Sequence, residues 1–454
     1  MRLLDGLQTG AATLMAQSHG ARVHGHNVAN VNTPGYHRQQ TVLQNTPAPT
    51  SGVRVADVQR HIDTNLEARM RGAMGEHAQA KTRAQGLQQL EGHIGKLGED
   101  GLDTRIGEFF AGWRELSAAP GDRAARRQVI SQGERLAGDV NRMAGALAAQ
   151  RQDLDTNIQR RVEQADTLLG EVAQLNQKIV ASEGGGQRAA DLRDHRGQKL
   201  ASLAELLGTK SSEQSNGAVT VLAGGGMTLV DGAVHRSLGT RARADGHHQI
   251  VFTDRPNTEI GTRLRGGEVA GMLALRDDVL PKHQNTLDQW AFDLANAVNG
   301  VHQAGTGRDG VSGRDFFSAP SGVAGAAEQL SVNPTVAAAT DAVAAGQSAA
   351  AGDNRAAADM VALEDDAAAM GGQETFAGAV RELAASVGEQ RRAARAAAQQ
   401  EEMAVRQLET AREQQSGVSI EEEMMMLERH QRGYQAASRV VTSINEMLDG
   451  LLRI

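Results

Sequence analysis

Histidine is the residue type with the most chemistry to offer in this chain of 454 residues, which contains no cysteine. His19, His24 and His26 fall within one expected helix, at spacings of five and two. Those spacings do not place three ligands on one helical face, and no carboxylate four residues away completes a site. The adjacent His247 and His248 fall in an expected loop. We therefore predict no metal site, and a surface or seam-flanking role for the first three histidines.

The sequence also lacks the residue spacings that known nucleotide-binding and catalytic motifs require. The glycine runs 184–186 and 224–226 are not followed by Lys-Ser/Thr, and neither fits a strand–GxGxxG–helix pattern. The sequence has no Gly-x-Ser-x-Gly elbow, and without cysteine it has no thiol nucleophile. Acidic runs such as 365–366 and 421–423 stand at expected helix starts, where they complement the helix dipole. We predict no catalytic residue and no cofactor, and the chain is not expected to be an enzyme.

Composition excludes further classes of function. The net charge is −8, from 47 Lys and Arg against 55 Asp and Glu, and the charges are interspersed. A mildly acidic chain with no basic stripe and few stacking aromatics argues against nucleic acid as a partner. No run of about 18 apolar residues exists, so we predict no membrane insertion. The first 20 residues lack a continuous apolar core, so they are not expected to be a cleaved signal peptide.

The elements that must position any functional residue are clearest at the two ends of the chain. Leu7, Leu14 and Val28 are spaced by multiples of seven near the start, and a second stripe recurs every seven residues near the end. The second stripe comprises Leu427, Tyr434, Val441 and Leu448, with Ile444 and Leu451 on its other edge. This spacing predicts two amphipathic helices that bury one narrow seam, within the subunit or between neighbours.

The body between these ends is predicted to be mostly long helices. No proline occurs between residues 121 and 255, or after Pro334, as long helices require. Short β-favouring runs over 209–263 predict a small antiparallel element, and 42–58 is expected to be an extended loop or irregular strand. Further helical periodicity is predicted over 154–179, 189–207, 268–301 and 376–408. Ser419 and Glu422 form an expected capping box that starts the last helix.

We therefore predict a mainly α, elongated, multi-domain fold. Terminal coiled-coil helices are joined to a long-helix bundle that carries a small antiparallel β element. The predicted segments are an N-terminal half of a terminal assembly domain (1–60), a helical domain (61–316), a short Ala/Gly-rich stretch (317–352), a return helix (353–415) and the C-terminal half of the assembly domain (416–454).

Two terminal motifs resemble one protein family. Residues 27–36 read Asn-Val-Ala-Asn-Val-Asn-Thr-Pro-Gly-Tyr, which resembles the N-terminal signature of bacterial flagellar axial proteins (rod, hook and hook-associated proteins). The following His37-Arg38-Gln39 is similar to the hook-associated protein 1 version of that signature. Residues 416–423, 434–440 and 444–447 resemble the ending of the same kind of protein. The likeness covers most of the chain.

The resemblance implies a structural subunit of the hook–filament junction that self-assembles through its terminal helices. It implies export through the flagellar type III apparatus without cleavage, and hence an extracellular location. The implied partners are the chain itself in a ring-like homo-oligomer, hook protein, a second junction protein and an export chaperone. Relatives often carry an outer β domain, which is expected to be absent or vestigial here because 317–352 is short. The alternatives are another axial protein (hook-associated protein 3, a distal rod or hook protein) or an intracellular coiled-coil scaffold.

The predicted site is an assembly interface. The turn residues Pro34, Gly35 and Tyr36 are expected to connect the first helix to the next domain, and nearby asparagines to satisfy backbone groups. The complete predicted set is Leu7, Leu14, Asn27, Val28, Asn30, Asn32, Pro34, Gly35, Tyr36, Arg38, Leu427, Tyr434, Val441, Ile444, Leu448 and Leu451.

Overall fold

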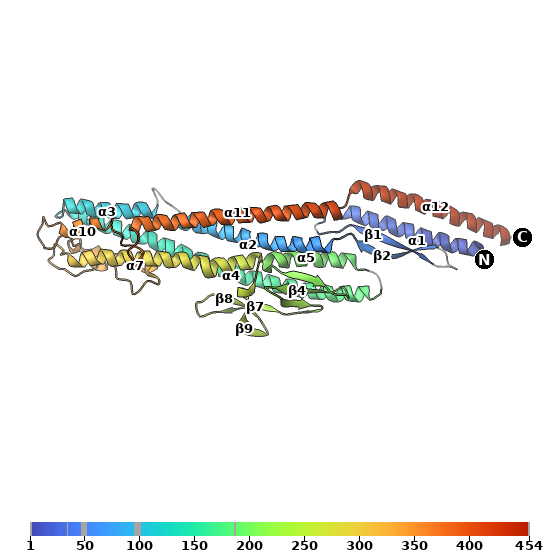
Figure 1. Ribbon diagram of the computed structural model, residues 1–454, viewed down its shortest axis with the longest axis horizontal. Coiled ribbons are helices and arrows are strands. Elements are labelled where there is room, and N and C mark those ends of the chain that lie inside the picture. Colours follow the sequence, from blue (N-terminus) through green and yellow to red (C-terminus); the bar gives the residue numbers. More distant parts are fainter. Residues whose placement is uncertain (1, 34, 47–51, 95–100, 186–187, 453–454) are drawn as a thin grey trace. The chain divides into compact units, whose positions relative to one another are not determined.

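A computed structural model describes residues 2–33, 35–46, 52–94, 101–185 and 188–452 (Figure 1). The chain divides into two compact units. Unit 1 comprises Met1–Gln79, Gln159–Ala270 and Gln399–Ile454, and unit 2 comprises Ala80–Ile158 and Gly271–Ala398. Both ends of the chain therefore belong to unit 1. The predicted fold class is confirmed, because the described elements are mainly helices with small antiparallel sheets.

The helices and strands follow in chain order. They are α1 (Arg2–Ala29), β1 (Gln39–Thr46), β2 (Gly52–Arg60), α2 (Thr64–Ile94), α3 (Leu102–Ala118), α4 (Arg123–Glu183), α5 (Ala190–Leu207), β3 (Lys210–Glu213), β4 (Val219–Ala223), β5 (Met227–Asp231), β6 (Val234–His235), β7 (Leu238–Ala242), β8 (His248–Phe252), β9 (Arg255–Glu259), α6 (Gly267–Ala274), α7 (Leu280–Ala304), α8 (Ala326–Gln329), α9 (Pro334–Ala338), α10 (Arg355–Ala362), α11 (Phe376–Ser416) and α12 (Ile420–Leu452).

Unit 1 contains three antiparallel sheets among its described residues. Strands β1 and β2 form a hairpin in which Gln39 pairs with Arg60, with a bulge between Val42 and Leu43. This is a more regular structure than the extended loop or irregular strand expected over 42–58. The orders of the other two sheets are β3-β4-β5-β6 and β7-β8-β9. Their strands span 210–259, inside the stretch for which a small antiparallel element was predicted.

The turn after α5 shows why the chain changes from helix to strand where it does. Gly208 has a left-handed backbone with φ of 64° and donates its N–H to the carbonyl of Ala204. A Cβ at this position would lie 2.2 Å from the carbonyl oxygen of Arg265. Only glycine meets both demands, so α5 ends here as predicted.

Unit 2 is built around a large hydrophobic core that includes most of the aromatic side chains. Phe109, Trp113 and Phe316 are fully buried, and Trp113 packs edge to face on both phenylalanines. The Ala/Gly-rich stretch 317–352 contributes buried Phe317 and Val336 to the same core. This stretch also carries the short helices α8 and α9.

One predicted helix is interrupted. The heptad spacing over 268–301 predicts a continuous helix, but residues Leu275–Val279 form a π-helical turn between α6 and α7. The wider turn accompanies a fully buried Arg276, whose Nη1 lies 2.6 Å from Oδ1 of the equally buried Asp155. A charge cannot be buried without such a partner. The apolar spacing could not reveal this, because Asp155 is 121 residues away.

Candidate functional site

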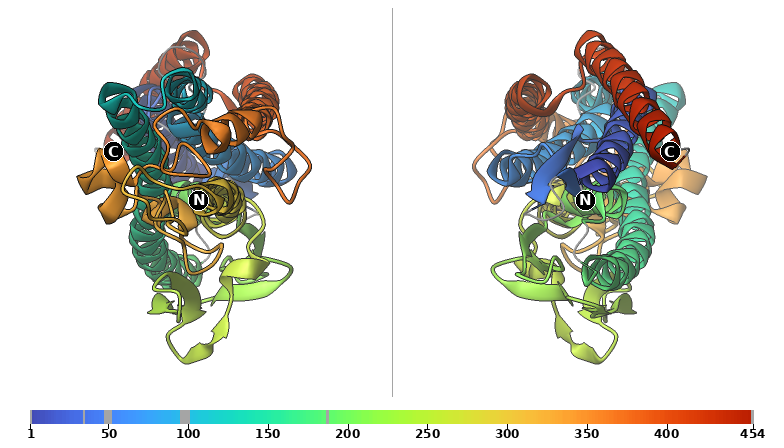
Figure 2. Two further views of the ribbon diagram at one scale, coloured as in Figure 1. Left: turned by 90° about the vertical axis from the view of Figure 1, so that its left-hand side faces the viewer. Right: turned by 90° about the vertical axis from the view of Figure 1, so that its right-hand side faces the viewer.

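The two terminal helices pack against each other in unit 1, and we call them the terminal helix pair. Figures 1 and 2 show α1 and α12 side by side. A Cβ on Gly6 would lie 3.1 Å from Cδ1 of Ile444, and one on Gly20 would lie 2.5 Å from Cε1 of His430. A residue later in α1 meets a residue earlier in α12, so the two helices are antiparallel.

Glycines on α1 fix how closely the two backbones approach. A Cβ on Gly10 would lie 2.6 Å from Cγ2 of Val441, closer than real Cβ contacts occur. Gly10 and Gly20 are buried, whereas Leu7 and Leu14 on the neighbouring stripe are only half-buried. The seam within the subunit is therefore carried by glycines, which sequence reasoning passed over because it followed the apolar side chains.

The predicted apolar residues divide into two groups. On α12, Ile444 is 8% exposed and buried in the pair, and Leu427, Val441 and Leu448 are half-buried. Tyr434 and Leu451 remain exposed, at 46% and 60% of their surface. Within one subunit the pair thus leaves part of the predicted interface open to solvent. Whether neighbouring subunits cover these residues stays a prediction.

Asn27 is the centre of a polar cluster at the base of the pair, which we call the polar hub (His24, Asn27, Tyr36, Arg38, Gln39 and Glu423); Tyr36 and Arg38 are half-buried and the other members are buried. Its Oδ1 accepts from the Tyr36 hydroxyl at 2.6 Å and from the backbone N–H of Gln39 at 2.9 Å. Its Nδ2 donates to the Gln39 carbonyl at 2.9 Å and to Oε2 of Glu423 at 2.8 Å. Each polar atom of this fully buried side chain is satisfied, so Asn27 ties α1, the hairpin and α12 together.

Glu423 is the charged member of the hub, and its side chain is 0% exposed. Nδ1 of His24 lies 2.6 Å from one carboxylate oxygen, and Nε of Arg38 lies 2.6 Å from the other. Burial raises the pKa of Glu423, but hydrogen bonds from Asn27 and His24 and the Arg38 charge outweigh burial and lower it. The carboxylate is therefore ionised, and it balances the cation on Arg38 inside the pair.

His24 shows where the histidine prediction was wrong. It is 4% exposed and stacks on the ring of His430, with centroids 5.2 Å apart. It lies in the seam itself rather than on the surface or beside the seam. No local pattern indicates this contact, because Glu423 is 399 residues away and its place in a run of three glutamates indicates only a helix start.

The start of α12 meets the turn after α1. Oγ of Ser419 accepts from the backbone N–H of Glu422 at 3.4 Å, as a capping box requires. The Glu422 carboxylate lies 3.3 Å from Nη1 of Arg38. The serine half of the predicted capping box is present, whereas the Glu422 side chain pairs with the turn residue Arg38 instead of returning to Ser419.

The other turn residues are placed as follows. Gly35 has φ of +74°, and a Cβ on it would lie 2.8 Å from Cγ of Gln198, so the turn needs glycine here. Asn30 donates from Nδ2 to the His26 carbonyl at 2.9 Å, which satisfies a helix-end carbonyl as predicted. Asn32 is exposed. The remaining predicted turn residue, Pro34, lies outside the described residues.

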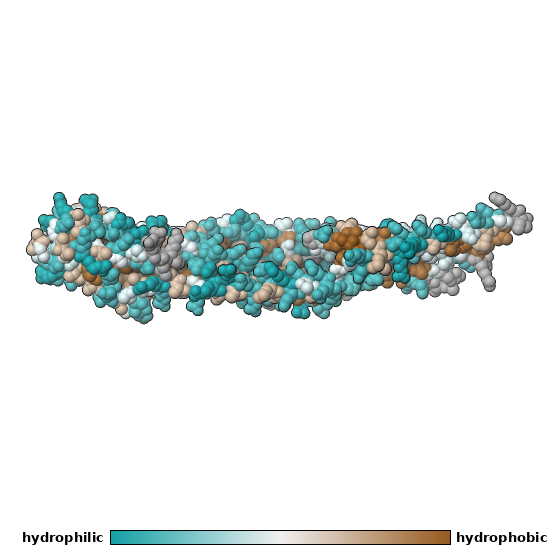
Figure 3. Space-filling view, turned by 90° about the horizontal axis from the view of Figure 1, so that it is seen from above, coloured by the Kyte–Doolittle hydropathy of each residue, from teal (hydrophilic) through white to brown (hydrophobic). Residues whose placement is uncertain are grey.

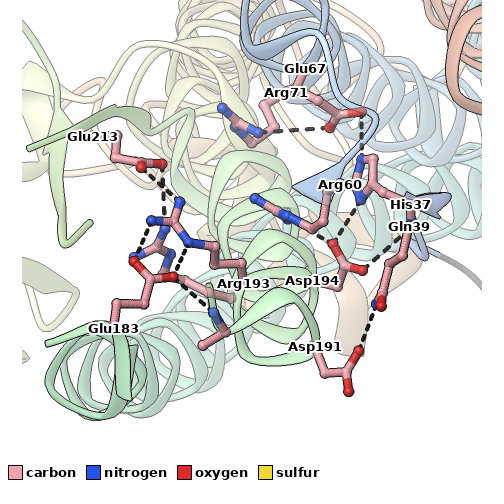
Figure 4. Close-up of polar contacts among 12 residues, drawn as sticks. His37, Gln39, Arg60, Glu67, Arg71, Glu183, Asp191, Arg193, Asp194 and Glu213 are labelled. Atoms are coloured by element: carbon pink, nitrogen blue, oxygen red, sulfur yellow. Dashed lines mark hydrogen bonds and ion pairs between the residues drawn. The ribbon is translucent and has the colours of Figure 1, made fainter. Parts of the chain in front are cut away.

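A second polar cluster connects the turn to α2 and α5, and we call it the joint (His37, Arg60, Glu67, Arg71 and Asp194; Figure 4). Nδ1 of His37 lies 2.8 Å from Oδ1 of Asp194, which also accepts from Nη1 of Arg60 at 2.7 Å. Nε2 of His37 lies 3.4 Å from Oε1 of Glu67. The joint was not predicted, although His37 lies inside the terminal motif.

Within the described ranges, no group of three or more His, Asp or Glu side chains could hold a metal ion. Of the helices built from described residues, none has the length and apolar character needed to cross a membrane. The hub and the joint are ion-pair networks that connect elements.

Comparison with known proteins assigns the chain to a protein family. Residues 87–317, just over half of the chain, match the flagellar hook-associated protein FlgK helical domain. The chain belongs to the FlgK family. Residues 410–454 match the C-terminal region of the flagellar basal body rod FlgEFG proteins. The FlgK family is one of structural flagellar proteins, and the resemblance drawn from residues 27–39 and 416–447 is confirmed.

Individual relatives agree with this family. Flagellar hook-associated protein 1 of Salmonella typhimurium is 29% identical over 329 residues, which cover 69% of this chain and 58% of the relative. The match therefore spans less than two thirds of that relative. The protein of the same name from Bacillus subtilis is 26% identical over 499 residues, covering 98% of this chain and 97% of the relative.

A solved structure has a similar fold. The flagellar hook junction protein FlgK from Burkholderia pseudomallei superposes with a TM-score of 0.69 and 16% sequence identity. The superposition covers 79% of this chain and all of that one.

Proposed function

We propose that this chain is a structural subunit of the hook–filament junction that assembles through its terminal helix pair. Membership of the FlgK family supports the junction, and the exposed apolar side chains of α1 and α12 support the mode of assembly. Val440 and Met447 on α12 are 53% and 49% exposed, and Met15 on α1 is 68% exposed. Concentrated exposed apolar surface marks a site of protein association.

The start of α12 adds to this surface. Figure 3 shows hydrophobic residues at the surface where α12 begins. Ile420, Met424 and Met425 are 50%, 52% and 63% exposed there. Unbranched methionine side chains adapt to partners of different shape, which suits a subunit that meets unlike neighbours.

The proposed partners are further copies of the chain in a ring-like homo-oligomer, hook protein, a second junction protein and an export chaperone. The proposed location is the extracellular flagellum, reached without cleavage of a signal peptide. We also propose that 1–60 and 416–454 form the two halves of one assembly domain, with 61–316 and 353–415 as the helical domain between them. The packing of α1 on α12 supports this division.

Complementation of cells that lack the gene tests the proposal. We expect Val440→Glu combined with Met447→Glu to abolish filament attachment, because two buried charges in the interface would lack partners. Val234→Glu is the control, since Val234 is 68% exposed on β6 of the same unit. Swimming and the release of filament protein into the medium are measured, with circular dichroism of each purified variant. Wild-type attachment by the folded double variant would refute assembly through this helix.

A further inference from the structure

The ring of His37 lies between two carboxylates. Its Nδ1 is 2.8 Å from Oδ1 of Asp194 on α5, and its Nε2 is 3.4 Å from Oε1 of Glu67 on α2. Its backbone N–H also donates to Oδ2 of Asp194, at 3.3 Å. Carboxylates only accept hydrogen bonds when ionised, so both ring nitrogens must carry protons to satisfy them. The geometry therefore requires an imidazolium.

The need for a proton on each ring nitrogen is strong because His37 and both carboxylates are buried. His37, Asp194 and Glu67 are 5%, 6% and 8% exposed, so water cannot replace a lost contact. Other titratable groups of unit 1 act on the trio. Three are cations: Arg60 on β2, 2.7 Å from Asp194, Arg71 on α2, 3.8 Å from Glu67, and Arg412 on α11, which acts on Glu67 through its charge. The Tyr36 hydroxyl in the turn also interacts with the Asp194 charge, and burial and the nearby carboxylates raise its pKa, so it stays neutral.

Helix α5 presents its side chains to the turn from one face. Asp191, Asp194 and Gln198 are three and four residues apart, so they lie on the same side of the helix. Asp191 accepts from Nε2 of Gln39 at 2.8 Å, and Gln198 lies against Gly35. The turn that follows α1 is thus held on α5 and α2 by contacts of which His37 is the central charged member.

We propose that His37 is a proton-operated lock in the joint, closed when its ring carries two protons and opened when it loses one. A neutral ring has one donor and one lone pair. The lone pair would then face a carboxylate at either Asp194 or Glu67, which is repulsive in a buried site. The turn between α1 and the hairpin would separate from α2 or α5, and the terminal helix pair would lose this attachment. This inference is independent of the junction proposal.

The direction of the pKa shifts agrees with the geometry. Burial lowers the pKa of His37, but the hydrogen bonds with Asp194 and Glu67 and their charges outweigh burial and raise it above the ordinary 6.5. A raised folded-state pKa contributes stability that is complete below pH 6.5 and is lost as pH rises through the folded-state pKa. The pKa of Glu67 is lowered, although burial opposes the shift, so its contribution is lost only as pH falls through its own folded-state value below 4.5. The lock therefore opens as the pH rises through the folded-state pKa of His37.

Ring-nitrogen NMR of the whole chain, labelled in its histidines, tests the charge directly. The His37 signal is identified by its loss in His37→Gln. We expect both ring nitrogens to be protonated in most molecules at pH 6.5, with a titration midpoint above 6.5. A His37 ring that is mostly neutral at pH 6.5 would overturn the proposal.

Hydrogen exchange tests the opening. After correction for intrinsic base catalysis, we expect the amides of residues 36–39 to lose protection by about tenfold between pH 6.5 and 9, the effect of one charge-assisted hydrogen bond. Glu67→Gln should suppress this loss, because the amide can donate to the deprotonated Nε2. His195→Gln is the matched control, since His195 is exposed on α5 beside Asp194. Unchanged protection in the wild type, or an equal loss in Glu67→Gln, would contradict the lock.

Discussion

Gly10→Ala measures how strongly the glycine seam fixes the terminal helix pair. The new methyl group would lie 2.6 Å from Cγ2 of Val441, whose β-branched side chain has little freedom to move away. Overpacking a tight contact costs about 1–3 kcal/mol, whereas replacing glycine by alanine within a helix gains about 1 kcal/mol. We therefore expect a net loss of up to about 2 kcal/mol from the packing of α1 on α12.

The matched control is Gly72→Ala on α2. A Cβ built there meets no heavy atom within 4 Å beyond its chain neighbours and the adjacent backbone of its own helix, so only the helix-propensity gain remains and α2 should be stabilised. The assay is native-state hydrogen exchange, read separately for the amides of α1 and α2. Val441→Ala combined with Gly10→Ala should recover part of the loss, because it removes the group that the new methyl meets. Greater protection of α1 in Gly10→Ala would refute the close-contact reasoning.

Three further predictions concern the hub and the turn. Glu423→Ala should destabilise the terminal helix pair by about 1–3 kcal/mol, because the buried donors of His24 and Asn27 lose their acceptor while Arg38 keeps Glu422; exposed Met424→Ala should change denaturant stability little. Because the folded-state pKa of Glu423 is lowered, its contribution should be present above pH 4.5 and be lost as pH falls through that lowered value, as acid titration of α12 exchange would reveal. Gly35→Ala should cost about 1 kcal/mol or more through its positive φ and Gln198, measured by urea unfolding.

Local signals in the sequence predicted much of the fold. Gly208 and Gly417 mark the ends of α5 and α11, and Ser419 marks the start of α12, because caps depend on residues a few positions apart. The long helices followed from apolar spacing and missing prolines. The π-helical turn at 275–279 could not be predicted, since it accompanies a buried ion pair with a distant residue.

The candidate site was predictable only in part, for the same reason. Asn27, Tyr36 and Arg38 were selected from the terminal motif, and they do lie together in the hub. The sequence pattern predicts a helix-start charge at Glu423 and a surface or seam-flanking position for His24. Their contact joins positions 399 residues apart, and no local pattern specifies which distant carboxylate a buried histidine will meet.

The hub can form only when residues from both ends of the chain are present. Its donors Arg38 and His24 come early in the chain, and the carboxylate that they require comes at position 423. A product that stops before residue 422 leaves Arg38 and His24 without the carboxylates of Glu422 and Glu423 and has no α12 on which the first helix can pack. Its first helix is thereby left unpaired, which exposes it to proteases.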